Sequence, residues 1–391
     1  MHLKFLYMHI GFDAKRAYQN GTGLGHYSRT LIRSLAEYFP ENRYTLFAPK
    51  ETDRFNVSQY PGMQLVTPTR FPDALLRSLW RSRRVTRDLR ERGINLYHGL
   101  SHEIPVGIRE TGIRSVVTVH DLIFERYPHQ YKTADIWIHR HKIKYACRNA
   151  DKVIAISAQT RDDLIGFYQV PADKIEICYQ SCNPAFGIPV GEETIRSIKK
   201  KYGLPETYFL YVGSIIERKN LLGICQAIHI LKDKLHIPLV AIGQGSAYKE
   251  KVNAYIREHK LEDRIILMSD NEAARHSPTF RNAEDFPAIY QGALAMIYPS
   301  TFEGFGIPVL EALLAKLPAI TSNISCLPET GGNAAYYVDP YSPQSMADAL
   351  EAVGTNPQLR ADMIEKGIAH AAGFSPKACA EAVNKVYQSI L

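Results

Sequence analysis

Short apolar runs alternate with helical patterns along nearly the whole chain. Short apolar runs bounded by turn residues are typical of buried strands in a parallel sheet. Strands that alternate with helices indicate an α/β fold whose parallel strands are joined by helices. The predicted strands are residues 3–10, 44–48, 95–98, 115–119, 151–156 and 174–178 in the first half of the chain, and residues 208–212, 239–242, 264–268, 294–298, 318–321 and 336–339 in the second.

The chain is long for a single hydrophobic core. Two domains are the default for a chain of 391 residues. The stretch 183–191 contains an Asn-Pro and an Ile-Pro pair and separates the two series of strands, so it is the predicted connection. We therefore predict two doubly wound, Rossmann-like domains that face a cleft, one formed by residues 1–187 and the other by residues 188–373.

The stretch from Glu303 to Glu311 follows the apolar run 294–298 and is the centre of the predicted chemistry. Gly304 and Gly306 allow a backbone to pass close to a bulky group, and a helical pattern follows them. In an open parallel sheet such a loop lies at the carboxyl end of the strands, where ligands bind. Two structural alternatives stay open: Glu303 is an exposed loop residue, and Glu311 is an acid in a helix's first turn, stabilised by the macrodipole.

This stretch resembles the signature of two glutamates with seven residues between them in the retaining nucleotide-sugar glycosyltransferases of the GT-B fold, the family-four group. The resemblance extends over nearly the whole chain. It implies that Glu303 contacts the transferred sugar and that Glu311 holds the ribose hydroxyls. It also implies that the final residues, 374–391, cross back to the N-terminal domain, which binds the acceptor. The donor-binding residues implied around this loop are Gly304, Phe305, Gly306, Ile307 and Glu311.

A glycine-rich stretch, Gly21 to Gly25, separates the first predicted strand from a helical pattern over 26–39. Such a loop directs backbone N–H groups and a helix N-terminus at an anion. The motif alone is equally compatible with a tight turn that binds nothing. Members of the family carry a similar turn that faces the donor diphosphate and sugar, so the resemblance implies a donor contact for Gly23 and Gly25.

His120 and Asp121 directly follow the predicted strand 115–119. A histidine at the carboxyl end of a strand lies where ligands bind in α/β domains, although a single histidine is more often structural. The family has a histidine at the matching place, near the hydroxyls of the transferred sugar. The resemblance therefore implies a catalytic role for His120 and an acceptor-side contact for Asp121.

Arg218 and Lys219 follow the strand 208–212 and Gly213. Arginine offers a planar fork of donors and lysine a compact charge, so the pair suits a diphosphate. A solvated basic pair is the structural alternative. The order of strand, glycine and Arg-Lys pair matches the family, but Ser214 stands where some members have a further arginine, so more of the phosphate contact rests on Arg218 and Lys219.

Residues 269–285 are longer and more polar than the family's usual link at this place. The family makes its base contacts just after the strand 264–268. The insertion is therefore either a mobile loop or an element of donor specificity.

Residues 72–93 form a basic segment, because eight arginines and three acids lie between Arg70 and Arg92. A basic amphipathic helix is typical of a membrane-surface element, whereas a solvated face of an ordinary domain helix is the alternative. No nucleic-acid-binding motif accompanies the charge, so we expect no nucleic-acid partner. The expected location is the cytoplasm, either free or peripheral on the inner face of the cytoplasmic membrane.

Composition is that of an ordinary soluble globular protein, with 45% apolar and 22% charged residues and a net charge of +7. No apolar run is long enough to span a membrane. The six cysteines lack a zinc-binding spacing and are expected to be free buried thiols. The chain shows no Asp-x-Asp set, so we expect no metal and no cofactor beyond the nucleotide-sugar co-substrate. The sequence does not predict the oligomeric state.

The resemblance implies a retaining, metal-independent hexosyltransferase. Glu303, His120, Arg218 and Lys219 are the implied catalytic set, with Gly213 among the donor contacts. A general likeness to bacterial mannosyltransferases favours GDP-mannose as donor, with a glycan or lipid-linked acceptor in surface polysaccharide assembly. The alternatives are a UDP-sugar donor and, from another class, a nucleotide-sugar-binding protein without catalysis. A phosphorylase would need a pyridoxal phosphate lysine motif, which we do not find.

Overall fold

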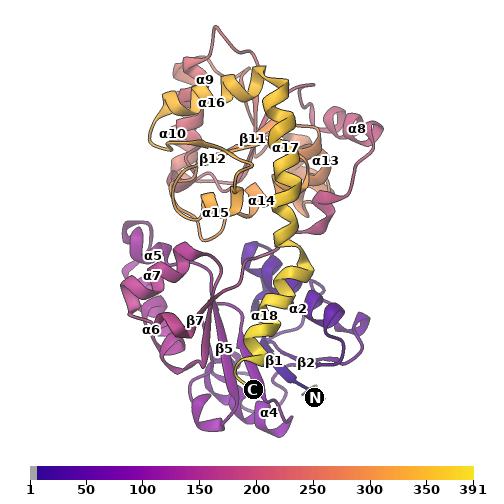
Figure 1. Cartoon of the computed structure of the whole chain (residues 1–391), viewed down its shortest axis with the longest axis vertical. Coiled ribbons are helices and arrows are strands. Elements are labelled where there is room, and N and C mark those ends of the chain that lie inside the picture. The colour runs from indigo at the N-terminus through magenta and orange to yellow at the C-terminus, as the bar shows by residue number, and fades with distance from the viewer. Residues whose placement is uncertain (1–6) are drawn as a thin grey trace. The chain divides into compact units, whose positions relative to one another are not determined.

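The computed structural model describes residues 7–391, which form two compact units (Figure 1). The first unit runs to Cys182 and includes Phe374–Leu391, and the second is Asn183–Gly373. Residues 183–187, which the sequence analysis assigned to the first domain, therefore belong to the second unit. Residues 3–6 of the first predicted strand lie outside the described residues. Its described part overlaps β1 (His9–Asp13), which begins later than predicted and extends further.

The first unit contains a parallel sheet in the order β3-β2-β1-β4-β5-β6-β7. Val116 and Val117 are neighbours on β5 and pack into two different hydrophobic clusters, as expected for a strand covered on both faces. β3 was missed, because the run is short and Gln64 interrupts it. The other strands are β2 (Arg43–Phe47), β3 (Met63–Val66), β4 (Leu96–Gly99), β5 (Arg114–Val119), β6 (Lys152–Ala155) and β7 (Ile175–Ile177).

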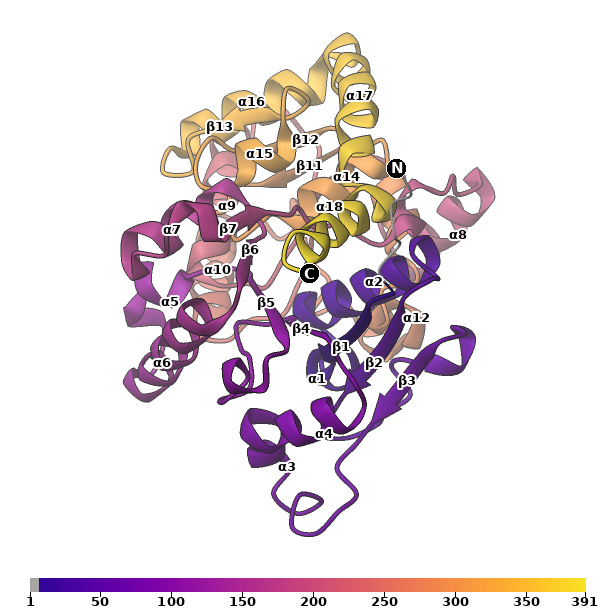
Figure 2. The same cartoon turned by 60° about the horizontal axis from the view of Figure 1, so that its bottom comes forward.

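Helices cover both faces of this sheet (Figure 2). Ser157 caps the N-terminus of α7, because its hydroxyl accepts a hydrogen bond from the Thr160 N–H at 3.1 Å. The helices of this unit are α1 (Lys15–Gln19), α2 (Gly23–Tyr38), α3 (Arg77–Leu79), α4 (Val85–Glu91), α5 (Ile123–Arg126), α6 (Thr133–Asn149), α7 (Ala158–Tyr168) and α18 (Pro376–Gln388).

The last helix, α18, returns to the first unit, which confirms the predicted crossing (Figure 1). It packs against α2, and its Tyr387 is fully buried. The Tyr387 hydroxyl lies 2.6 Å from Nδ1 of His98, at the end of β4. The C-terminal residues therefore complete the core of the first unit.

The second unit contains a parallel sheet in the order β10-β9-β8-β11-β12-β13. Its strands are β8 (Phe209–Val212), β9 (Leu239–Ile242), β10 (Ile265–Leu267), β11 (Ala295–Tyr298), β12 (Ala319–Ser322) and β13 (Tyr336–Val338). Its helices are α8 (Glu192–Tyr202), α9 (Leu221–Ile230), α10 (Ala247–Glu258), α11 (Glu272–His276), α12 (Pro278–Arg281), α13 (Phe286–Gln291), α14 (Ile307–Leu314), α15 (Leu327–Gly331), α16 (Pro343–Thr355) and α17 (Pro357–Ala371).

Each sheet has one point where the strand order reverses: between β1 and β4 in the first unit, and between β8 and β11 in the second. The connections on the two sides of such a point leave in opposite directions and open a crevice at the carboxyl ends of the strands. Ligand sites in the two units are therefore expected next to β1 and β4 and next to β8 and β11.

The basic segment 72–93 is not one amphipathic helix. It consists of α3, a π-helical stretch (Trp80–Arg84) and α4, and Trp80 is fully buried. Arg81 forms an ion pair with Asp13, and Arg84 and Arg87 pair with Asp73, so part of its charge is neutralised inside the unit.

The large apolar side chains that this part of the chain exposes lie mainly before α4, in the stretch 71–79. Phe71 is 83% and Leu75 76% exposed, and Leu76 and Leu79 are also exposed. In Figure 2 this stretch loops out beside α3 and α4 at one edge of the first unit. We call residues 71–79 the apolar loop.

Residues 269–285 fold into α11 and α12, so they are not an irregular loop. The side chains of Asn271 and Ser277 cap these helices by accepting hydrogen bonds from the N–H groups of Ala274 and Phe280. No helix in residues 7–391 is both long and apolar enough to cross a bilayer. The six cysteines are free and buried, as predicted.

Candidate functional site

The predicted donor-binding residues of the second unit meet at the reversal point of its sheet. Arg218 and Lys219 follow β8, and Glu303 follows β11. These two strands are neighbours in the sheet, although Arg218 and Glu303 are 85 positions apart in the chain. The fold thus brings two separately predicted motifs to one crevice.

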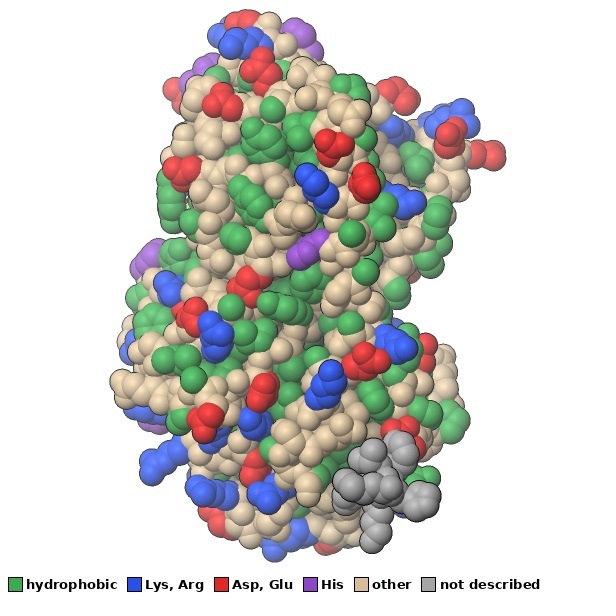
Figure 3. All heavy atoms as spheres, in the orientation of Figure 1, with side chains coloured by type: hydrophobic (Ala, Val, Ile, Leu, Met, Phe, Trp, Pro, Cys, Tyr) green, Lys and Arg blue, Asp and Glu red, His purple; other side chains and the backbone are tan. Residues whose placement is uncertain are grey.

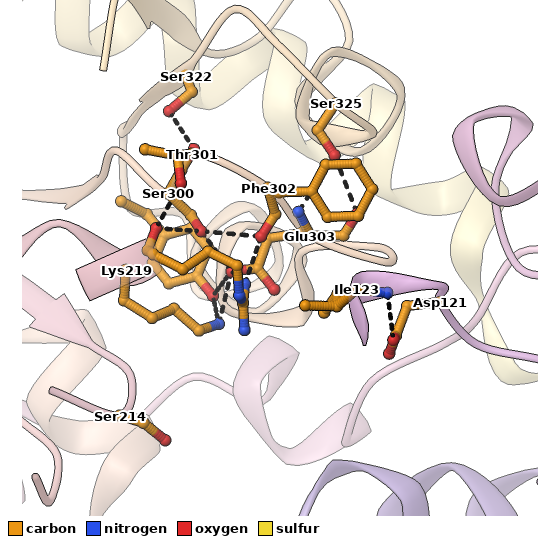
Figure 4. A network of polar contacts seen from close by, with 12 residues as sticks. Asp121, Ile123, Ser214, Lys219, Ser300, Thr301, Phe302, Glu303, Ser322 and Ser325 are labelled. Atoms are coloured by element: carbon orange, nitrogen blue, oxygen red, sulfur yellow. Dashed lines mark hydrogen bonds and ion pairs between the residues drawn. The ribbon is translucent and has the colours of Figure 1, made fainter. Parts of the chain in front are cut away.

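Oxygen Oε1 of Glu303 accepts four polar contacts (Figure 4). Arg218 Nη1 lies 2.9 Å and Lys219 Nζ 2.6 Å from it. The hydroxyls of Ser300 and Tyr298 donate to the same oxygen over 2.6 Å and 3.0 Å. All four contacts are made to Oε1. No residue between positions 7 and 391 forms a hydrogen bond or ion pair with the second carboxylate oxygen, Oε2, which can therefore accept hydrogen bonds from a ligand.

Glu303 is only 8% exposed, so the alternative of an exposed loop residue is wrong. Burial by itself would raise the pKa of Glu303, but the charges of Lys219 and Arg218 lower it to about 2. Burial lowers the pKa of Lys219, an effect that Glu303 opposes. One buried carboxylate thus faces two cations.

The loop after Glu303 is held by the segment that follows β12. Ser325 Oγ accepts from the N–H of Glu303 at 3.1 Å and donates to its carbonyl oxygen at 2.9 Å. The Thr330 hydroxyl donates to the carbonyl oxygen of Phe305. Gly306 has φ of +98° at the N-cap of α14, and a Cβ there would come within 2.8 Å of Leu327, so both conformation and space require glycine.

The other residues predicted around this loop have different surroundings. The Phe305 side chain is buried, so Phe305 can contact a ligand only through its backbone. Gly304 lies in the buried loop, and Ile307 is the first residue of α14. Gly213 follows β8, beside the Arg218 segment. Ser300, Tyr298 and Ser325 were not predicted from the sequence. Of these, Ser300 could have been indicated by its position just after the end of β11.

Glu311 is the fifth residue of α14, so the alternative of an acid in the first helical turn is wrong. The Tyr290 hydroxyl donates to its Oε2 over 2.9 Å. Burial raises the pKa of Glu311 to about 7, and the hydrogen bond from Tyr290 opposes that shift only in part. A carboxyl group with such a pKa is poised to gain hydrogen bonds from ligand hydroxyls when it ionises.

A cavity of about 470 Å³ opens at the carboxyl ends of β9 and β10. Arg275, Phe280 and Arg281 of the folded insertion form one wall, and Phe286 adds an aromatic ring. The hydroxyl oxygen of Ser269, also in this lining, is buried without a hydrogen-bond partner among the described residues. An apolar pocket with a few polar groups and an unsatisfied donor is suited to a flat heteroaromatic ligand.

In the first unit, Gly23 and Gly25 lie in the first turn of α2, not in a loop before it. A Cβ at Gly25 would come within 1.9 Å of the Asn20 carbonyl oxygen, so this glycine is required by its own turn. A Cβ at Gly23 would meet no heavy atom within 4 Å. Of the two predicted positions, only Gly23 leaves open space for a ligand.

His120 is buried, and the protein contacts both of its ring nitrogens. Nε2 lies 2.9 Å from the Leu100 carbonyl oxygen, and Nδ1 lies 3.3 Å from Nε2 of Gln180. Burial lowers the pKa of His120 to about 3, so the ring is neutral at physiological pH. The Asp121 carboxylate accepts from the N–H of Ile123 at 3.1 Å (Figure 4). Both ring nitrogens of His120 thus have partners within the first unit.

Within residues 7–391, no group of three or more His, Cys, Asp or Glu side chains is arranged to hold a metal ion.

Comparisons with known proteins agree with this division of the chain. The family described as Glycosyltransferase Family 4 matches residues 22–186, and the one described as Glycosyl transferases group 1 matches residues 194–370. The O-antigen chain mannosyltransferase B of Escherichia coli is 24% identical over 380 residues, which are 94% of this chain and 96% of that relative.

Two solved structures share the fold over the whole chain. A glycosyltransferase from Rickettsia africae ESF-5 has a TM-score of 0.74 at 15% identity and covers 99% of both chains. Anabaena Alr3699/HepE, solved in complex with UDP-glucose, has a TM-score of 0.72 at 15% identity and covers 98% of this chain and 100% of its own. At these identities the likeness shows the GT-B fold alone.

Proposed function

The chain belongs to the glycosyltransferases that join a family 4 domain to a group 1 domain, and from that premise we propose that it transfers a hexose from a nucleotide-sugar to a glycan or lipid-linked acceptor. The observation that carries this proposal is the cluster of Arg218, Lys219 and Glu303 at the reversal point of the second sheet. It pairs two buried cations with a carboxylate that keeps one oxygen open. That combination fits a substrate in which a diphosphate adjoins a hydroxyl-rich sugar.

In the proposed reaction the bond between the sugar C1 and the diphosphate oxygen breaks, and a bond from C1 to the acceptor oxygen forms. The acceptor oxygen attacks C1 from the same face that the diphosphate leaves, and the proton of the acceptor hydroxyl passes to the leaving diphosphate. The anomeric configuration is therefore retained without a protein nucleophile. Arg218 and Lys219 stabilise the negative charge that develops on the leaving group. Oε2 of Glu303 accepts a hydrogen bond from a sugar hydroxyl, and Glu311 accepts from the ribose.

GDP-mannose is the donor that we propose. The mannosyltransferase relative supports the sugar. Arg275 and Arg281 support the base, because guanine presents two adjacent acceptors that an arginine fork matches. A UDP-sugar is the second candidate, since HepE binds UDP-glucose in the same fold.

We also propose that the enzyme works at the surface of an anionic membrane, where a lipid-linked acceptor would lie. The apolar loop supports this proposal, because its exposed apolar side chains are accompanied by exposed arginines. Arg77 and Arg83 form no ion pair within the described part of the chain. Figure 3 shows Lys and Arg side chains gathered at the end of the first unit where α4 lies. Apolar residues flanked by arginines are suited to the interface of an anionic bilayer.

The test of the proposed function is a binding and transfer screen without added metal. GDP-mannose, UDP-glucose, UDP-galactose, UDP-N-acetylglucosamine and the free nucleotides are compared by thermal shift, since a ligand of the folded state raises the melting temperature by mass action. Positive donors are then incubated with mannose-containing glycans, and product is detected by mass spectrometry. Stabilisation by GDP and GDP-mannose, followed by transfer, is the expected result. Stabilisation by the UDP compounds would show that the donor is a UDP-sugar and not GDP-mannose. Binding without transfer to any acceptor would favour a non-catalytic nucleotide-sugar-binding protein. No stabilisation by any of these ligands would reject the proposed donor site.

A further inference from the structure

His102 has an unusual backbone conformation at a place where ligands are expected. It follows β4, one of the two strands at the reversal point of the first sheet. Its φ is +63°, in the left-handed region that few residues other than glycine adopt. Its N–H donates to the Thr118 carbonyl oxygen over 2.9 Å, which holds this conformation. Residues kept in such conformations by their surroundings cluster at functional sites.

The neighbours of His102 determine which ring nitrogen carries the proton. The backbone N–H of His120 donates to Nε2 of His102 over 2.9 Å. Because a backbone amide only donates, this nitrogen carries no proton. Burial lowers the pKa of His102 to about 4, so the ring is neutral at physiological pH and its single proton is on Nδ1.

The Nδ1–H group of His102 is not used by the protein. It has no hydrogen-bond partner among residues 7–391, and His102 is only partly buried. The neighbouring ring of His120 differs, because both of its nitrogens are engaged within the unit. The two rings lie side by side, with centroids 5.5 Å apart.

We propose that His102 is a substrate-contacting residue that donates a hydrogen bond from Nδ1–H to a hydroxyl oxygen of a sugar substrate, and that His120 positions it. The proposal rests on the proposed function and assigns to the first unit a sugar contact that the sequence analysis placed on His120. The donor is uncharged, which suits a hydroxyl oxygen better than a phosphate. His120 contributes its backbone N–H, which fixes the tautomer of His102.

The matched pair His102→Asn and His102→Asp tests this role. Both side chains tolerate the left-handed region and can accept from the N–H of His120, but only Asn can also donate to a substrate. His102→Asn is expected to keep most of the wild-type kcat/KM. His102→Asp is expected to lose about tenfold, which corresponds to the loss of one hydrogen bond. His102→Gly is a second variant without the hydrogen-bond donor, and it relieves the backbone strain, so it should fold even if the Asp variant does not. Its kcat/KM should fall by a similar factor.

Deoxy-sugar substrates then identify the hydroxyl. The wild-type enzyme should discriminate against the analogue that lacks the contacted hydroxyl, and His102→Gly should not, since the two changes remove the same hydrogen bond. Wild-type kcat/KM in both the Asp and the Gly variant would overturn the proposal. So would an Asn variant as impaired as the Asp variant.

Donor binding separates this proposal from the proposed function. Thermal shift by nucleotide reports the site in the second unit and should be unchanged in all three variants. Failure of the wild type to bind any nucleotide-sugar would reject the proposed function. Normal binding together with full transfer in the Asp and Gly variants would reject only the role of His102.

Discussion

Lys219 Nζ lies 2.6 Å from Oε1 of Glu303, and both side chains are almost fully removed from solvent. Arg218 contacts the same oxygen at 2.9 Å. A buried carboxylate thus screens two cations from each other while the site holds no substrate. A diphosphate would bring negative charge to the same two cations. The free protein and its complex with donor would therefore balance these charges in different ways.

Glu303→Gln should destabilise the free protein and increase the stabilisation by nucleotide. Removing one partner of a buried ion pair costs about 3–5 kcal/mol, because the remaining charges stay buried without compensation. A diphosphate would supply that compensation, so the rise in melting temperature on adding nucleotide diphosphate should be larger in the variant than in the wild type. Transfer activity should fall by at least about tenfold, since the sugar contact is weakened.

Glu217→Gln is the matched control for this experiment. Glu217 is exposed and precedes the same two cations in the chain, so the variant makes the same change in net charge without removing the buried contact. It should leave both the melting temperature and the nucleotide response close to the wild-type values. Equal behaviour of the two variants would contradict the role assigned to Glu303.

Binding of an intact nucleotide-sugar should weaken as the pH falls below about 7, the pKa of Glu311 in the free protein. Ribose hydroxyls would donate to the ionised carboxylate, so the complex has a lower pKa than the free protein and binding releases a proton. Affinity then falls by up to about tenfold per pH unit between the two pKa values. Glu311→Gln should bind more weakly, with an affinity that does not change over this range. An intact nucleotide-sugar is used because a terminal phosphate titrates near pH 6 itself.

The raised pKa of Glu311 also affects the stability of the ligand-free protein. The pKa of Glu311 is higher in the folded protein than its ordinary value of 4.5, so the native state binds this proton more tightly. The contribution of this residue to the free energy of unfolding is therefore fully present below about pH 4.5 and is lost as the pH rises to about 7. Glu311→Gln should remove that component, which denaturant unfolding of the ligand-free protein at several pH values would detect. An unchanged pH dependence in the variant would contradict the raised pKa.

Arg281→Ala should reduce the preference for GDP over UDP. A bidentate contact between arginine and guanine contributes about 1–3 kcal/mol of discrimination, which is about five- to 150-fold in the affinity ratio. Calorimetric titration with both nucleotides measures this ratio, and Arg275→Ala tests the other arginine of the cavity. Arg257→Ala on α10 is the control, because Arg257 is exposed and lies outside the cavity lining. A ratio that stays constant in both cavity variants would exclude base selection by the insertion.

The fold was largely predictable because the pattern that specifies it is local. Apolar runs bounded by turn residues reveal buried strands one at a time, and only β3, interrupted by Gln64, escaped. The order of strands in a sheet is not local. Glu303 and Arg218 could each be predicted from a motif, but their contact could not, since it depends on β8 and β11 being neighbours.

Two other parts of the prediction depended on partners distant in sequence. The arginines of 72–93 indicated an amphipathic helix, and no helical pattern could show that Asp13 and Asp73 neutralise some of them. His102 was missed because its signal is a backbone angle and a hydrogen bond from His120, neither of which a sequence pattern displays.

The last prediction concerns the apolar loop. The double variant Leu75→Ser/Leu76→Ser should bind vesicles of mixed anionic and zwitterionic phospholipid at least about tenfold more weakly than the wild type, because burying each leucine contributes about 1.5–3 kcal/mol. Ile188→Ser is the matched control, since Ile188 is 62% exposed but lies in the second unit. Arg77→Ser/Arg83→Ser should weaken binding mainly at low salt, where the attraction to anionic lipid is least screened. Vesicle co-sedimentation measures all three, and turnover of a water-soluble acceptor should be unchanged throughout. If the leucine variant and the wild type bound the vesicles equally, the proposal that the apolar loop contacts the membrane would be rejected.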